Sequence, residues 1–190
     1  GWKIELHDDD GNPVGVGEEG RIAIRTRDPS PVGLFMEYVD DPEATAKVFV
    51  GDWYYTGDKA IMDEDGYFWF QGRDDDIIKS SGYRISPAEV ESALMTHPCV
   101  KESAVVGSPD PIRGVIVKAF ICLKDGWTGS DDLIRELQTH VKSTTAPYKY
   151  PRAIEFVEEL PKTISGKVRR VELRDREIQR YKEQNEHQDE

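Results

Sequence analysis

The chain changes its sequence pattern at "GRDDD", residues 72–76, and this change most limits the folds available to it. Residues 1–76 hold 19 Asp and Glu against 7 Lys and Arg, whereas residues 77–190 hold 18 of each. Short alternating segments precede the change, and both helical and strand periods follow it. A length of 190 residues allows one ordinary domain or two small ones. We therefore expect a domain boundary near residues 72–76, with one domain on each side.

The first of these domains is predicted to be rich in β-structure. Apolar and polar residues alternate in "WKIEL" and in "RIAIRTR". The stretch "WYYTGDKAIMDEDGYFWFQGR" is typical of a hairpin, with "DEDG" at the turn and aromatic residues in the second strand. One short helix is expected at "DPEATAKVF". Small antiparallel sheets or a partial barrel fit this pattern.

The second domain is expected to begin with a hairpin and a helix. "DIIKSSGYRIS" has the pattern of two short strands that turn at Ser81 and Gly82. Ser86 is the expected N-cap of the helix and Pro87 its first residue, because proline needs no partner for its missing N–H there. Glu89, three residues after Ser86, is predicted to complete a capping box.

The remainder of the second domain alternates strands and helices. "VKESAVVGS", "VIVKAFICL" and "RAIEFVEEL" are predicted strands, and "VELRDREIQRYKEQ" is a weakly amphipathic helical tail that we expect to fray. Ser130 is predicted to cap a helix that buries Leu133, Leu137 and Val141. This order indicates a compact α+β domain with a small sheet flanked by helices.

Composition and charge exclude several classes of function. Hydrophobic residues make up 37% and charged residues 33%, and no run approaches the roughly 18 apolar residues of a membrane span. The start shows no secretory signal and begins as if within a strand, so we expect a piece of a longer protein. A net charge of −12 disfavours nucleic acid and anionic membranes. The locally basic stretch 147–170 suits a small anionic ligand.

The cysteines and histidines show no pattern of a metal site. Cys99 and Cys122 are far apart, so we expect two reduced thiols in a core and a reducing compartment. The histidines lack metal-ligand spacing, and a zinc site is not expected. The four histidines are His7, His97, His140 and His187.

Lys167 lies in "LPKTISGKVRR", a loop between a predicted strand and the helical tail. The stretch is not a phosphate-binding P-loop, because Pro161 stands at the first glycine position and Val168 replaces the Ser or Thr that would bind magnesium. Gly166 leaves the backbone beside the lysine permissive. Lys167 is either an ordinary solvated lysine or a charge that must reach a phosphate or carboxylate.

Two further stretches have a structural and a functional interpretation. Asp58 in "YYTGD" either closes a turn or accepts the hydroxyls of a ribose. Arg73 and Arg84 flank "DDDIIKSSGY" and either pair with nearby acids or bind phosphate.

The order of these motifs resembles the C-terminal portion of the adenylate-forming enzymes. The motifs are "TGD", then "GRDDDIIKSSGYRISPAEVE", then "PKTISGK". This superfamily comprises acyl-CoA synthetases, adenylation domains of peptide synthetases and beetle luciferases. The resemblance covers essentially the whole chain and is greatest to medium-chain acyl-CoA synthetases. It implies that residues 1–74 end a large N-terminal adenylation domain, within a distorted β-barrel subdomain, and that residues 75–190 form a mobile lid.

The resemblance also implies roles for individual residues. Family members join a carboxylic acid to ATP as an acyl-adenylate, and the thiol of CoA then displaces AMP. By this likeness Asp58 and Arg73 bind the nucleotide, and Lys167 is the catalytic cation of the adenylation step. The family's nucleotide loop and acyl pocket belong to the large N-terminal domain, outside these 190 residues.

The lid of the family rotates between the two half-reactions. Asp75, two residues after Arg73, is the implied hinge, although the run of three aspartates places it only to within one residue. After rotation Ser81, Gly82 and Arg84 would face CoA during thioester formation.

The resemblance therefore implies the C-terminal part of an ATP-dependent carboxylic acid:CoA ligase, with this piece inactive by itself. ATP and CoA are the expected co-substrates, with Mg²⁺ bound mainly by the missing domain and no metal site in this chain. The expected partners are a small carboxylic acid and the chain's own N-terminal domain. Expected locations are the mitochondrial matrix in an animal or the cytoplasm in a microbe. An adenylation domain that loads a carrier protein and a non-catalytic interaction module remain alternatives.

Overall fold

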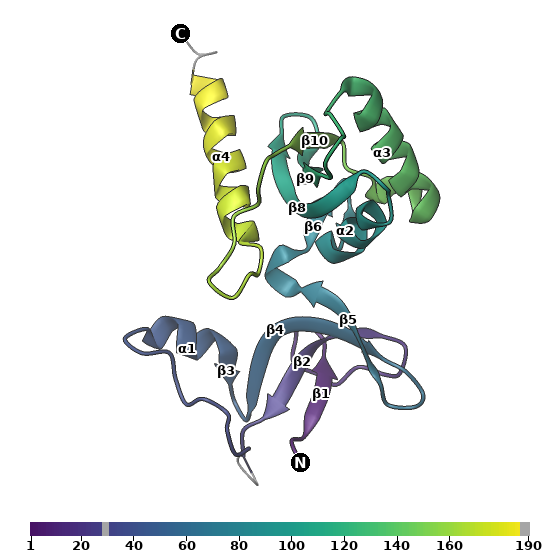
Figure 1. Ribbon diagram of the computed structural model, residues 1–190. Coiled ribbons are helices and arrows are strands. Elements are labelled where there is room, and N and C mark those ends of the chain that lie inside the picture. The colour runs from purple at the N-terminus through teal and green to yellow at the C-terminus, as the bar shows by residue number, and fades with distance from the viewer. Residues whose placement is uncertain (28–30, 187–190) are drawn as a thin grey trace. The chain divides into compact units, whose positions relative to one another are not determined.

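The computed structural model describes residues 1–27 and 31–186 (Figure 1). The chain forms two compact units, Gly1–Asp75 and Asp76–Glu190. This division falls one residue after the boundary expected between residues 74 and 75. The short 3₁₀ turn η1 (Asp74–Asp76) carries the chain from the first unit to the second.

The first unit is built on one five-stranded antiparallel sheet, which confirms the expected β-rich segment. Strand β4 pairs with β2, β3 and β5, and β1 pairs with the outer edge of β2. Register shifts between β2 and β4 and between β4 and β5 curl this sheet. The elements of this unit are β1 (Ile4–His7), β2 (Glu19–Arg25), α1 (Pro42–Val48), β3 (Phe49–Val50), β4 (Trp53–Met62) and β5 (Phe68–Arg73).

The predicted hairpin at "DEDG" is present between β4 and β5. The side chain of Asp63 closes its turn by accepting hydrogen bonds from the backbone N–H groups of Asp65 and Tyr67 over 3.1 and 2.8 Å. Gly66 follows with a φ of 83°, a conformation that glycine adopts without strain. This turn fixes the register that places Asp58 opposite Arg73.

The second unit has a small mixed sheet with helices on both faces (Figure 1). Strands β8 and β9 pair antiparallel, and β10 joins the other edge of β9 in parallel. A two-stranded hairpin, β6–β7, precedes this sheet. The elements are β6 (Ile78–Ser80), β7 (Tyr83–Ile85), α2 (Pro87–Met95), β8 (Val100–Asp110), β9 (Gly114–Leu123), α3 (Asp131–Thr144), η2 (Pro147–Lys149), β10 (Ala153–Phe156) and α4 (Arg170–Glu186).

The sheet of the second unit buries both of its faces. Because successive side chains of a strand point to opposite faces, Val105 of β8 and Ile121 of β9 pack with α2 and α3. Val106 and Phe120 pack on the other face with Leu173 of α4. Continuous apolar runs in β8 and β9 therefore reflect two cores, one under each layer of helices.

The two predicted helix starts have different outcomes. The Ser130 side chain accepts a hydrogen bond from the Leu133 N–H of α3, as predicted for an N-cap. Ser86 precedes α2 and Pro87 begins it, also as predicted. The capping box is wrong, because the Ser86 side chain accepts no cap hydrogen bond from the described residues of α2. The carboxylate of Glu89 binds Lys149 over 2.6 Å.

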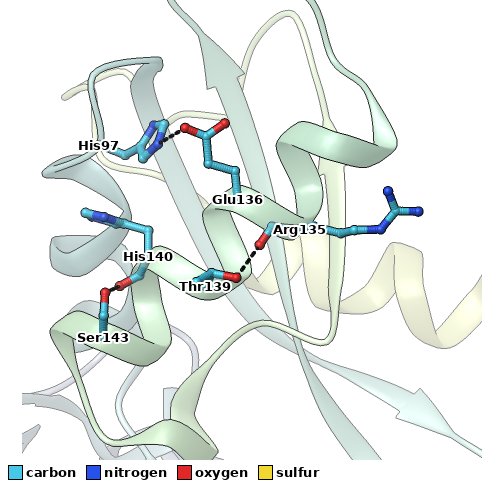
Figure 2. A pocket seen from close by; sticks show the side chains of 6 residues that line it. All are labelled: His97, Arg135, Glu136, Thr139, His140 and Ser143. Atoms are coloured by element: carbon cyan, nitrogen blue, oxygen red, sulfur yellow. Dashed lines mark hydrogen bonds and ion pairs between the residues drawn. The ribbon is translucent and has the colours of Figure 1, made fainter.

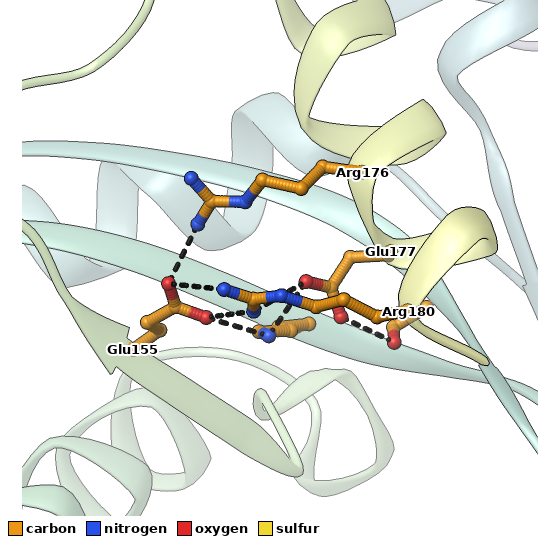
Figure 3. A network of polar contacts seen from close by, with 6 residues as sticks. Glu155, Arg176, Glu177 and Arg180 are labelled. Atoms are coloured by element: carbon orange, nitrogen blue, oxygen red, sulfur yellow. Dashed lines mark hydrogen bonds and ion pairs between the residues drawn. The ribbon is translucent and has the colours of Figure 1, made fainter. Parts of the chain in front are cut away.

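Helix α4 is more firmly packed than its weakly amphipathic sequence suggests. Leu173 is buried against the sheet, and Glu177 is buried beside Lys118 of β9 (Figure 3). The exposed residues of α4 are mostly charged, which lowers the apolar content of the helix, although one face with Leu173 and Glu177 is buried. Leu173 and Glu177 anchor this part of the helix to the sheet, and the fraying of the tail stays a prediction.

Both cysteines are buried free thiols, as expected. Burial raises the pKa of Cys99 and of Cys122, so both remain protonated at neutral pH. In the described part of the chain, every helix is too short or too polar to cross a bilayer.

Candidate functional site

Asp58 and Arg73 lie opposite each other on β4 and β5. The hairpin register brings the guanidinium Nη1 of Arg73 to 3.6 Å from Oδ1 of Asp58. Both side chains are partly exposed, at 47% and 33%. The structure thus joins two residues whose spacing in the sequence is fifteen positions, and leaves their polar atoms accessible to a ligand.

The glycine of "TGD" is needed for the packing of Arg73. Gly57 has a φ of 80°, and a Cβ added there would lie 2.8 Å from Nη2 of Arg73. Arg73 Nη1 also donates to the Thr56 carbonyl over 3.4 Å, and the Thr56 hydroxyl accepts from the Asp58 N–H over 3.1 Å. The motif therefore forms a small platform under the guanidinium.

Asp75 and its neighbour Asp74 contact cations of the first unit. Arg73 Nε donates to Asp75 Oδ1 over 3.1 Å, so the local pairing that the sequence left open for this arginine is present. Asp74 lies 3.0 Å from the buried ammonium of Lys59. These contacts hold the start of η1 against the β4–β5 hairpin.

Ser81 and Gly82 form the turn of the β6–β7 hairpin, as predicted. Their φ values are 50° and 83°, so both adopt the left-handed conformation of a tight hairpin turn. Arg84 lies opposite Lys79 in the register. The Ser80 hydroxyl donates to the Val115 carbonyl over 2.7 Å and fastens this hairpin to β9.

The loop that carries Lys167 is a closed turn. The Thr163 N–H donates to the Lys167 carbonyl over 2.8 Å, and the Thr163 hydroxyl accepts from the Lys167 N–H over 3.1 Å. A bridge between Lys162 and Val168 lies beneath this turn. Sequence inspection missed Thr163, although a threonine four residues before a lysine and three before a glycine is a signal for such a side-chain-closed turn.

Lys167 differs in its contacts from the other lysine of this loop. Lys162 donates to Glu102 over 2.8 Å. Lys167 is exposed, and no residue in the described ranges forms an ion pair with its ammonium. A depression of about 610 Å³, lined in part by Thr163 and Arg169, lies beside the loop. The loop thus presents a cation from a fixed backbone.

A second depression, of about 440 Å³, lies over α3 and contains none of the predicted site residues (Figure 2). His97 points toward Glu136, and its Nε2 lies 3.2 Å from the carboxylate. His97 Nδ1 lies 3.0 Å from the sulfur of Cys99. Among the described residues, no group of three or more His, Cys, Asp or Glu has the arrangement of a metal site.

Comparison with known proteins identifies relatives of both units. Residues 89–167 match the family described as the AMP-binding enzyme C-terminal domain. The chain is 60% identical over 178 residues to the human mitochondrial acyl-coenzyme A synthetase ACSM1 and 58% identical over the same length to the human mitochondrial ACSM5. Each match covers 93% of this chain, but the chain spans only 31% of each relative.

The solved structures that resemble this chain also include CoA ligases and CoA synthetases. An anthranilate CoA ligase in complex with anthranoyl-AMP has a TM-score of 0.81 and 44% identity, covering 93% of this chain and 33% of that one. The o-succinylbenzoate CoA synthetase of Bacillus subtilis, in complex with its acyl-adenylate intermediate, has a TM-score of 0.77 and 30% identity, covering 92% of this chain and 33% of that one. Residues 89–167 therefore match the AMP-binding enzyme C-terminal domain, and the chain as a whole is similar to the C-terminal third of acyl-coenzyme A synthetases and CoA ligases.

Proposed function

We propose that this chain is the C-terminal part of an ATP-dependent carboxylic acid:CoA ligase. The relatives are named acyl-coenzyme A synthetases, and two similar structures hold acyl-adenylates. The observation that carries the proposal is the exposed ammonium of Lys167, at the last residue of the matched family domain, which lies on a closed turn and forms no ion pair with any described residue. Because the relatives are named mitochondrial, we place an animal protein of this sequence in the mitochondrial matrix.

Lys167 would act in the first half-reaction. A carboxylate oxygen of the acid attacks the α-phosphorus of ATP, the bond to the bridging oxygen breaks, and pyrophosphate leaves with that oxygen. Negative charge gathers on the phosphoryl oxygens in the transition state, and a preorganised cation stabilises it. Both the N–H and the carbonyl of Lys167 are hydrogen bonded to Thr163, so the backbone of this residue is already ordered in the free protein. Substrate binding therefore loses little conformational entropy at this position.

Asp58 and Arg73 would hold the nucleotide. A carboxylate accepts two hydrogen bonds, which suits the adjacent hydroxyls of a ribose. The Arg73 guanidinium stands 3.6 Å from this carboxylate, so it would reach the ribose or its neighbourhood when the nucleotide is bound. The platform formed by Thr56 and Gly57 fixes the position of this guanidinium beside Asp58.

The second half-reaction would use the other face of the lid. The CoA sulfur, as the thiolate after loss of its proton to solvent, attacks the acyl carbon, the bond to the phosphate oxygen breaks, and AMP leaves with that oxygen. Rotation at Asp75 would withdraw Lys167 and bring the hairpin at Ser81, Gly82 and Arg84 toward the thiol arm. The left-handed turn at residues 81 and 82 narrows the hairpin tip, which suits a close approach to a thin pantetheine chain.

The nucleotide and metal need groups beyond this chain. Mg²⁺ would accompany ATP, but the described residues do not offer a cluster that fits a metal, so we assign it no ligand here. Consecutive aromatic residues of β5, including Trp69 and Phe70, are about 60% exposed. An exposed aromatic strand supports contact with a preceding domain of the same protein, which would supply the rest of the site.

The test uses the longer protein that contains this sequence and measures the half-reactions separately. Wild type should catalyse acid-dependent exchange of pyrophosphate into ATP and transfer an acyl group from supplied acyl-adenylate to CoA. Lys167→Ala should lower the exchange by roughly 10²–10³-fold but spare the transfer, and Lys167→Arg should retain more of the exchange. Equal losses in both steps would contradict the role of Lys167. Acyl transfer to a carrier protein but not to CoA would show that the acceptor is a carrier protein and would contradict the proposal of CoA.

A further inference from the structure

Arg170 begins α4 three residues after Lys167. Its Nε and Nη2 donate to the two carboxylate oxygens of Glu91 over 2.8 and 2.6 Å. This paired geometry fixes the plane of the guanidinium as well as its position. The Arg170 side chain is only 27% exposed and that of Glu91 13%, so the pair is largely shielded from solvent.

Glu91 connects three elements of the second unit. It lies on α2, and its Oε1 also accepts a hydrogen bond from the Val105 N–H of β8 over 2.8 Å. The carboxylate thus holds the first residue of α4 against both helix α2 and the edge strand β8 of the sheet. Such a contact sets where α4 begins, and therefore where the preceding loop ends.

The same guanidinium also contacts the start of the second unit. Arg170 Nη1 lies 3.5 Å from Asp76, and Arg174, one turn later, lies 3.5 Å from the other oxygen of Asp76. Asp76 directly follows Asp75, the proposed hinge residue. Asp76, the first residue beyond the hinge, therefore contacts Arg170, which lies at the base of the Lys167 loop, and also Arg174.

The link from Arg170 to Lys167 is short and stiff. The Arg169 N–H donates to the Pro161 carbonyl over 2.8 Å, and Val168 forms a bridge with Lys162. These contacts leave little freedom between the guanidinium and the turn that presents Lys167. A displacement of Arg170 therefore displaces the loop as well, because the backbone between them is not flexible enough to compensate for it.

We propose that Glu91 is a positioning residue for Lys167 that acts through Arg170, and that Asp76 ties the same guanidinium to the hinge. This inference rests on the proposed role of Lys167 in adenylation. When the lid rotates, residue 76, α2 and the Lys167 loop move as one body, so rotation at a single residue delivers the ammonium to a defined point.

The first experiment compares the two half-reactions in the longer protein carrying Glu91→Gln. The glutamine keeps an oxygen for the Val105 N–H but loses the charge that binds Arg170. We expect acid-dependent ATP–pyrophosphate exchange to fall by up to about 10²-fold, since small misplacements of a catalytic group have costs of this size. Acyl transfer from supplied acyl-adenylate to CoA should be unchanged. Equal losses in both half-reactions, or no loss in either, would overturn the proposal.

A double-mutant test separates positioning from general stability. If Glu91 acts through Lys167, Glu91→Gln should cause no further loss of exchange in a Lys167→Ala background. The same fractional loss in both backgrounds would overturn the proposal. Absence of exchange in the wild type would instead remove the proposed function on which this inference rests.

Two further variants guard against a folding defect. Arg170→Lys keeps a charge beside Glu91 but loses the paired geometry, so its exchange should lie between wild type and Glu91→Gln, with an unchanged melting temperature. Arg176→Gln is the matched control, because Arg176 lies on the same helix but away from the loop, and the change breaks its 2.6 Å ion pair to Glu155 of β10. Its exchange should equal that of the wild type. A loss as large as that of Glu91→Gln would show that any weakening of α4 suffices and would refute the specific role.

Discussion

The ammonium of Lys118 on β9 donates a hydrogen bond of 2.8 Å to Glu177 on α4, and both side chains are buried. Lys118 also donates to Glu155 of β10 over 2.8 Å, and Glu177 accepts from the Ser108 hydroxyl over 2.9 Å. Arg180 adds contacts to both carboxylates (Figure 3). Helix α4 is thus held to three strands by a polar network whose central pair, Lys118 and Glu177, is buried.

Lys118→Met should destabilise the chain by about 3 kcal/mol, because breaking a buried pair leaves a charge poorly compensated. The cost lies at the lower end for such pairs since Arg180 and Ser108 still contact Glu177. Urea unfolding measures the change in the free energy of unfolding. Lys118→Met with Glu177→Leu is the control and should recover most of the loss, because an apolar pair leaves no unpaired charge. A double variant as unstable as the single one would contradict this explanation.

Glu155 should make the chain sensitive to acid. Burial raises the pKa of Glu155, but hydrogen bonds from Arg180 and Lys118 outweigh it and lower the pKa from 4.5 to about 2. The folded state therefore binds this proton less tightly than the unfolded state. The stabilisation is complete above the unfolded value of 4.5 and is lost as the pH falls toward about 2.

Glu155→Gln removes this titration, so its free energy of unfolding should decline less steeply over the same pH range. Urea midpoints measured at successive pH values provide the comparison. Glu158→Gln, an exposed acid three residues away, is the control and should follow the wild type. Identical slopes for Glu155→Gln and wild type would show that the network does not govern acid unfolding.

Gly57→Ala should impair nucleotide binding more than its effect on stability explains. Gly57 and Gly66 both have φ near 80°, but only at Gly57 would a Cβ meet Arg73, at 2.8 Å from Nη2. Both alanine variants should lose about 1 kcal/mol of stability from backbone strain. Only Gly57→Ala should raise the KM for ATP in the longer protein, since it displaces the guanidinium from Asp58. Equal KM values for the two variants would argue against this platform.

The aromatic strand β5 should bind an apolar dye in the separate 190-residue chain. Trp69 and Phe70 are 61% and 60% exposed on consecutive positions, so both faces of the strand present aromatic surface. Trp69→Thr with Phe70→Thr should reduce the fluorescence of a bound naphthalene sulfonate dye. Ile112→Thr is the control, because Ile112 is 84% exposed but belongs to the second unit. An equal reduction in the control would exclude β5 as the main dye site.

Local chemistry in the sequence predicted most of the elements. The Asp63 turn, the Ser81–Gly82 turn and the Ser130 cap each depend on residues within a few positions, so their type and place follow from the sequence alone. The capping box at Ser86 and Glu89 was predicted from neighbouring residues and is not formed, and the Glu89 carboxylate binds Lys149, sixty residues away in the sequence.

The candidate residues Asp58, Arg73 and Lys167 were found from motifs, and tertiary structure decided what surrounds them. The hairpin register places Arg73 against Asp58, and the turn closed by Thr163 leaves Lys167 without an acidic partner among the described residues. Neither the bond between Glu91 and Arg170 nor that between Lys118 and Glu177 has a local signal.

The sequence by itself determined the order of strands and helices, because alternation, caps and turns act over a few residues. The tertiary structure decided the parallel pairing of β10 with β9 and which charges became buried partners. The physical reason is that a charge can pair with any opposite charge on an extended chain. Only packing of α4 and α2 on the sheet selects one partner by bringing it within hydrogen-bond distance and excluding water.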